Sequence, residues 1–326
     1  DSGFLLNAAI TQENFLGTGD AVSVNFSQSD FSRIYSLSHT APYATVDGIS
    51  RSVSGFWRST NASDANLTDF DTRSLGLNIG FNVPISEFNS FGVGLGYDNT
   101  KIETSGFTAQ EIVDFLDQNG NTFGSLRANF SIATDTRNKR IFPDRGGFQR
   151  LGLETALPVG DLQFYKLNYQ RQNYFPFTDN TTLMVGTNLG YGDAYGDTSA
   201  LPFFENFFAG GFRSVRGFEN NSLGPRASDD DPFGGNKLIT GRGELFFPVP
   251  FLEQQSANFR MSAFMDAGNV FGPGESVRFG DLRASTGVAA LWISPFGAIT
   301  VSFAQPLNDK KGDEVERFQF NLGANF

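Results

Sequence analysis

The chain has 326 residues, of which 18% are charged, and carries a net charge of −11; it contains 37 glycines, 37 phenylalanines and no cysteine. The acidic balance argues against a nucleic-acid-binding protein, which needs a basic face to displace counterions from the phosphates. The lack of cysteine excludes a disulfide framework, thiol chemistry and cysteine-based zinc sites.

No stretch of the sequence approaches the roughly 18 consecutive apolar residues that a membrane helix needs, and the mean hydropathy is −0.23. These values do not exclude a transmembrane β-barrel, because only every second residue of a barrel strand faces lipid.

Alternation of large and small side chains with a period of two is the main signal along the chain. Between Leu75 and Val83, large apolar residues alternate with glycine and asparagine, and segments 91–97 and 183–191 repeat the pattern with aromatic residues among the large ones. The small face carries few charges, whereas a soluble sandwich would place charges there. The pattern therefore favours a wall between lipid and a lumen.

About fifteen segments of this kind predict an all-β fold, a transmembrane antiparallel β-barrel that occupies residues 1–326 as one outer-membrane domain. The predicted strands are 3–12, 22–29, 32–40, 49–58, 73–84, 90–102, 123–136, 147–157, 161–175, 181–193, 237–248, 258–270, 282–293, 297–306 and 316–326.

The connections between these strands alternate in length. Compact turns are predicted at 40–48, 82–90, 176–180 and 294–297, and mostly longer polar loops at 59–72, 104–122, 197–236 and 272–281. Short periplasmic turns and long exterior loops are typical of outer-membrane barrels.

The odd number of predicted strands has a consequence for the N-terminus. Single-chain bacterial barrels have an even number of strands, so that both chain ends lie in the periplasm. The alternation of short turns and long loops instead places Asp1 on the exterior side. We therefore expect 16 strands in the full protein, with the first strand missing from this chain; a miscount is the simpler alternative.

One long loop contains a predicted helix. Thr108 and Glu111 match the S/T-x-x-E capping box, an apolar stripe follows between Ile112 and Leu116, and Gly120 can end the helix.

The last predicted strand ends on an aromatic residue. Its apolar side chains share one face: Phe318, Phe320, Leu322, Ala324 and Phe326. A C-terminal phenylalanine on an alternating strand matches the signal by which outer-membrane proteins are recognised for assembly, so it indicates location rather than activity. Gly323 interrupts the strand, and because glycine weakens a strand interior, we expect a weak seam where this strand closes the barrel.

The longest loop carries the tetrapeptide Val215, Arg216, Gly217 and Phe218. We expect the loop to fold into the lumen, where Arg216 needs a partner because an unpaired buried charge costs several kcal/mol. Glu244 and Asp266 fall on the lumen faces of the two strands that follow. Gly217 would let the loop backbone approach the wall closely.

Residues 203–226, "FFENFFAGGFRSVRGFENNSLGPR", resemble the sixth extracellular loop of the BamA family, the central subunits of the bacterial outer-membrane β-barrel assembly machinery. The VRGF tetrapeptide is similar to the hallmark of their superfamily. Further matches follow in order at 14–20, 41–50, 135–147, 201–211, 292–298, 302–307 and 317–323. The family's periplasmic POTRA domains are absent from the chain, and the match begins at the second barrel strand.

The resemblance implies that Glu244 and Asp266 receive Arg216, either as an internal brace or in contact with clients. It implies an insertase without covalent chemistry, cofactor or metal, in which the seam between first and last strands opens and a client's C-terminal strand pairs by β-augmentation. The implied partners are unfolded outer-membrane β-barrel proteins with their periplasmic chaperones, accessory lipoproteins of the complex, and the bilayer with its lipopolysaccharide.

Two other functions remain open. A two-partner secretion or autotransporter-assembly transporter of the same superfamily would share the tetrapeptide but would need a dedicated secreted substrate. A passive porin would lack an arginine-paired plugging loop. His39 is the only histidine, which excludes a histidine-based metal cluster and argues against a phospholipase that needs a serine–histidine pair.

Overall fold

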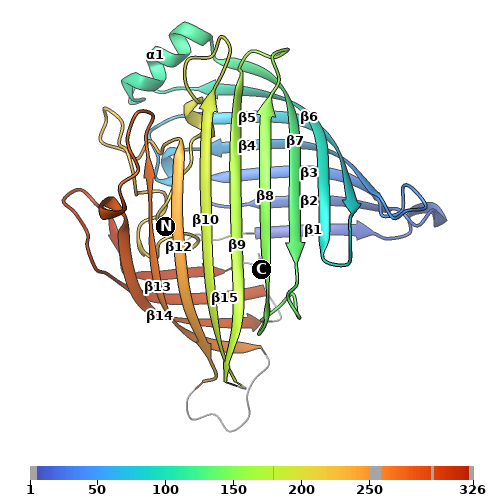
Figure 1. Ribbon diagram of the computed structural model, residues 1–326. Coiled ribbons are helices and arrows are strands. Elements are labelled where there is room, and N and C mark those ends of the chain that lie inside the picture. Colours follow the sequence, from blue (N-terminus) through green and yellow to red (C-terminus); the bar gives the residue numbers. More distant parts are fainter. Residues whose placement is uncertain (1–5, 179, 250–257, 295–296, 323–326) are drawn as a thin grey trace.

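The computed structural model describes residues 6–178, 180–249, 258–294 and 297–322. Most of these residues form one antiparallel sheet of fifteen strands, in which neighbours along the chain are neighbours in the sheet. Figure 1 shows this sheet curled into a barrel, with the green and yellow strands along the front and the blue strands passing behind. The predicted fold class and strand number are confirmed.

The observed strand boundaries agree with the predicted ones to within a few residues. The strands of the large sheet are β1 (Leu6–Gln12), β2 (Ala21–Gln28), β3 (Ser32–Ala41), β4 (Ser50–Asn61), β5 (Asp71–Pro84), β6 (Asn89–Glu103), β7 (Thr122–Asp135), β8 (Gly146–Ala156), β9 (Phe164–Thr178), β10 (Thr181–Ala194), β12 (Lys237–Phe247), β13 (Phe259–Phe271), β14 (Arg283–Ser294), β15 (Gly297–Pro306) and β17 (Phe318–Leu322).

The two faces of the wall differ as the alternation predicts. Leu75 and Leu77 of β5 are 63% and 68% exposed, as expected of side chains that face hydrocarbon. In β13, exposed Met265 lies between buried Phe264 and Asp266, which point to the opposite face. Thus exposed large apolar side chains cover the outside, while the lumen face carries polar side chains such as Asp266 and a few buried aromatic ones such as Phe264.

The long loops gather at one end of the barrel and the short turns at the other. The longest loop, residues 195–236, lies against the lumen side of the wall, where its Val215, Phe218 and Leu223 are buried together with Val270 of β13. Within this loop the short strand β11 (Gly217–Phe218) pairs with β16 (Val315–Glu316), which immediately precedes β17.

The loop helix α1 (Gln110–Asn119) forms, but the predicted capping box is wrong. The N-cap is Ala109, which has no side-chain cap. Thr108 Oγ1 instead donates to the Asp69 carbonyl at 2.7 Å, and Glu111 Oε2 accepts from Ser228 Oγ at 2.7 Å. Neighbouring loops thus compete for both side chains. The predicted end is confirmed, because the Gly120 N–H donates to the Leu116 carbonyl.

The apolar stripe of α1 covers the loop end of the barrel. Ile112 and Phe115 pack into a cluster with Phe123 at the start of β7 and Phe203 of the long loop. Of the described segments, no helix is both long and apolar enough to cross a membrane.

The sheet has two edges in the described residues. There β1 pairs only with β2, and β17 pairs only with β15.

Candidate functional site

Arg216 lies in the long loop, is 1% exposed, and contacts two carboxylates on adjacent strands. Its Nε and Nη2 donate to the two Asp266 oxygens at 2.6 and 2.8 Å. Its Nη1 and Nη2 donate to the two Glu244 oxygens at 3.1 Å each. Forked pairing of this kind uses the planar guanidinium on both sides, and it is among the strongest hydrogen bonding that side chains offer.

The register of β12 and β13 brings the two acids together. Glu244 lies opposite Phe264, and Asp266 lies opposite Arg242, so both carboxylates project from neighbouring positions of the lumen face. The Arg216 Cζ lies 3.3 Å from the centroid of the Phe264 ring, which adds a cation–π contact. Alternation on two paired strands therefore builds the whole receptor for the loop arginine.

The charges of the site balance. Arg242 Nε lies 3.3 Å from Asp266, so two cations face two carboxylates. Burial alone would lower the pKa of the Arg216 guanidinium, but its hydrogen bonds to Asp266 and the charges of both acids raise that pKa. Arg216 is therefore charged at every physiological pH.

Gly217 and Phe218 bring the loop backbone onto the wall. Gly217 has a φ of +91°, and a Cβ placed there would lie 3.0 Å from the Ala304 side chain of β15. A larger residue would need both a strained backbone and a displaced wall. The expected close approach at Gly217 is confirmed.

The loop is also bonded to the last strand, which the sequence did not predict. Gln319 of β17 donates from Nε2 to the Phe218 carbonyl at 2.8 Å, and the Glu219 N–H donates to the Glu314 carbonyl at 2.9 Å. Gln319 is 3% exposed. Its position between Phe318 and Phe320 already marks it as a lumen-facing residue, but only the structure shows its partner.

A model of the Omp85 superfamily domain matches residues 14–326. The chain belongs to the Omp85 superfamily. An outer membrane protein assembly factor BamA from Neisseria meningitidis serogroup B is 31% identical, with 100% of this chain and 46% of the relative aligned. The chain thus spans about half the length of the curated relatives it matches.

Two solved structures extend the comparison. BamA from Haemophilus ducreyi lacking POTRA domains 1-3 matches this Omp85 barrel with a TM-score of 0.88 and 28% identity, over 98% of this chain and 68% of the other. CdiB from Acinetobacter baumannii matches with a TM-score of 0.62 at 14% identity, over 98% of this chain and 56% of the other, and that likeness shows the fold alone. The barrel is a protein of the Gram-negative outer membrane.

The predicted seam residues of the Omp85 barrel fall partly within the structure. Phe318 and Phe320 are 60% and 37% exposed on the outer face of β17, and Leu322 is half-buried. Gly323 and Phe326 lie outside the described residues.

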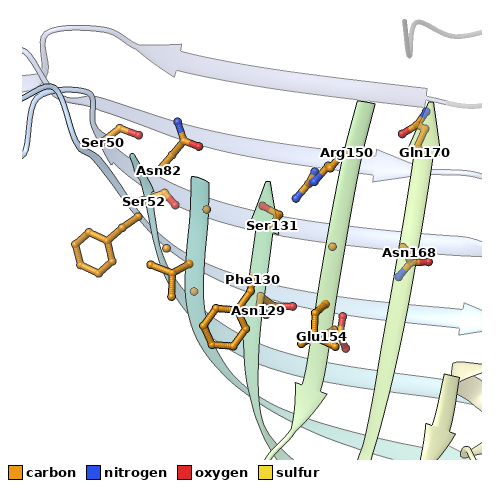
Figure 2. Close-up of a pocket in the computed structure, with 17 residues that line it drawn as sticks. Ser50, Ser52, Asn82, Asn129, Phe130, Ser131, Arg150, Glu154, Asn168 and Gln170 are labelled. Carbon is orange, nitrogen blue, oxygen red and sulfur yellow. The ribbon is translucent and has the colours of Figure 1, made fainter. Parts of the chain in front are cut away.

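An open cavity of about 540 Å³, lined by polar and apolar side chains, lies along strands β4 to β9. Figure 2 shows Asn129, Ser131, Arg150 and Gln170 among its lining residues. Across the described ranges, no group of histidine, aspartate and glutamate side chains has the arrangement of a metal site.

Proposed function

We propose that this chain is the barrel of an outer-membrane protein insertase, which assembles client β-barrels through a seam between its first and last strands. The similarity to BamA proteins over the whole chain supports this function. The VRGF loop, held by Glu244 and Asp266, keeps the barrel in shape while the seam opens.

One observation carries the proposal. Among the described residues, β17 is an edge of the sheet: it pairs with β15 on one side only, just as β1 at the other edge pairs with β2 alone. The proposed seam lies at this edge, where the outer side of β17 can pair with the first strand or with a client strand. Opening exposes backbone N–H and C=O groups at membrane depth, and each unsatisfied group costs several kcal/mol in lipid.

A client strand can remove that cost. An unfolded barrel protein presents its C-terminal strand to the open edge and pairs with it by β-augmentation. Because each later hairpin pairs with the preceding one, the client backbone never meets lipid unpaired. The barrel contributes binding and geometry, and no covalent step is required.

The full protein would contain more than this chain. We infer that a first strand precedes it and completes a 16-stranded barrel, and that periplasmic POTRA domains precede that strand. Those domains would receive clients from periplasmic chaperones and bind the accessory lipoproteins of the assembly complex, while the bilayer and its lipopolysaccharide surround the barrel.

A disulfide lock tests the function. In cells that depend on this protein, cysteines at Phe318, Phe320 or Leu322 would each be combined with a cysteine scan along the first strand. A locked seam should stop the assembly of porins, and a reductant should restore it. The control is a disulfide between Val288 and Phe303, which lie directly opposite each other in the β14–β15 ladder. Normal porin assembly with the seam locked would contradict the proposal.

A secretion transporter is the second candidate, because the CdiB barrels share the fold. Depletion of the protein distinguishes the two functions. An insertase predicts that many outer-membrane barrels decline together, whereas a transporter predicts the loss of one secreted substrate with porin levels unchanged.

A further inference from the structure

A second ionic contact holds the long loop, and it lies apart from the Arg216 site. Glu205, in the single-turn helix η3 (Phe203–Glu205), inserts its carboxylate between two cations of the wall. Arg127 Nη1 of β7 lies 2.8 Å from Glu205 Oε1, and Lys166 Nζ of β9 lies 3.1 Å from Glu205 Oε2. All three side chains are at least four-fifths buried.

Arg127 is also held by two acids of the wall itself. Arg127 also contacts Asp98 of β6 at 2.7 Å and Glu154 of β8 at 2.7 Å. Four adjacent strands therefore contribute one charged side chain each to a cluster that ends on the loop carboxylate. Such a network is costly to break, because removing one member leaves a buried charge unpaired.

Next to Glu205, the loop packs directly on β10. A Cβ at Gly190 of β10 would lie 2.7 Å from the Phe207 ring, and one at Gly192 would lie 2.9 Å from Leu201. Larger residues at these positions would lift the loop from the wall. The β6–β9 side thus offers cations to a loop acid, and β12 and β13 offer acids to a loop arginine.

We propose that Glu205 is a second positioning residue of the VRGF loop. With Arg216 it holds the loop on either side of β10, in addition to the Arg226–Glu314 ion pair further along the loop, and so helps to set where Phe218 meets Gln319 on the last strand. The two anchors have opposite polarity, so neither loop residue can occupy the other's site. The effect on client assembly rests on the proposed function, but the position of the loop does not.

Spin-label distances test the position directly. The chain contains no cysteine, so labels at Arg213→Cys in the loop and Val277→Cys in the loop between β13 and β14 would be the only ones within it. We expect a narrow distance distribution in the native barrel and a second, broader population in Glu205→Gln. Lys166→Gln should broaden the same distance distribution, and combining it with Glu205→Gln should broaden the distribution no further.

Two controls define the outcomes. Arg216→Ala should broaden the distribution, which establishes that the label pair senses the loop, and Asp230→Asn at the exposed tip of the same loop should not. An unchanged distribution in Glu205→Gln would overturn the proposal. In proteoliposomes, Glu205→Gln should slow porin assembly several-fold. Broadening with an unchanged assembly rate would confirm the anchor and contradict its role in the proposed function.

Discussion

At the scale of single residues, Arg216 is the group on which the loop position most depends. Its guanidinium occupies a site made of two carboxylates and an aromatic ring, and the shape of that site matters as much as its charge. The alternation of β12 and β13 was enough to predict that Glu244 and Asp266 face the lumen. The sequence could not predict the partners of Gln319 or Glu205, because alternation gives the face on which a strand residue lies but not which loop atom it meets there.

Substitution of Arg216 separates charge from geometry. Arg216→Ala leaves Glu244 and Asp266 with a single cation, Arg242, and the uncompensated buried charge should lower the free energy of unfolding by about 3–5 kcal/mol. Arg216→Lys keeps the charge but cannot bond both acids in the forked geometry, so we expect an intermediate loss. Urea titration of the barrel in detergent micelles measures both values. A lysine variant as stable as the native barrel would show that the forked geometry is unnecessary.

Gln319 offers a second prediction at this scale. Gln319→Leu removes one of two donors to the Phe218 carbonyl, which keeps its hydrogen bond from the Gly211 N–H at 3.0 Å, so we expect the loss of one hydrogen bond, about 0.5–1.5 kcal/mol. The matched control is Gln305→Leu on β15, whose exposed side-chain amide donates to the adjacent Pro306 carbonyl. The temperature at which each barrel unfolds on a semi-native gel should fall for the first variant and change little for the second.

At the scale of elements, the strands were predictable and the helix cap was not. Period-two alternation continues through every long strand of the wall, so even approximate boundaries follow from the sequence. The capping box failed because Asp69 and Ser228, from other loops, bond Thr108 and Glu111. Local motifs are overridden where loops pack on one another.

The long loop should respond to pH through Glu205. Burial alone raises the pKa of its carboxyl, but the charges of Lys166 and Arg127 outweigh burial and hold the pKa below its usual value. A lowered pKa means that the anchor contributes fully above the ordinary pKa of about 4.3 and is lost as pH falls through the lower folded-state value. The distribution of distances between the labels at positions 213 and 277 should therefore broaden only below about pH 4. In Glu205→Gln the distance distribution should already be broad at neutral pH. If an acid transition persists in that variant, the transition belongs to another titrating group.

At the scale of the whole molecule, the described residues combine a barrel wall, an anchored loop and a last strand, β17, that pairs on one side only. Composition and alternation predicted the barrel and its loop asymmetry, because a wall between lipid and lumen imposes both. They could not predict how the loop lies on β10 or reaches the last strand, since those contacts depend on the curvature of the barrel wall. The sixteenth strand and the periplasmic domains stay predictions.

The central claim is that the wall is weakest at its last strand, and amide hydrogen exchange in lipid bilayers tests it most directly. Backbone amides of β17 should exchange much faster than those of β14, which has a long ladder on each side. Equal protection of the two strands, in the full protein under conditions in which it assembles clients, would contradict the claim.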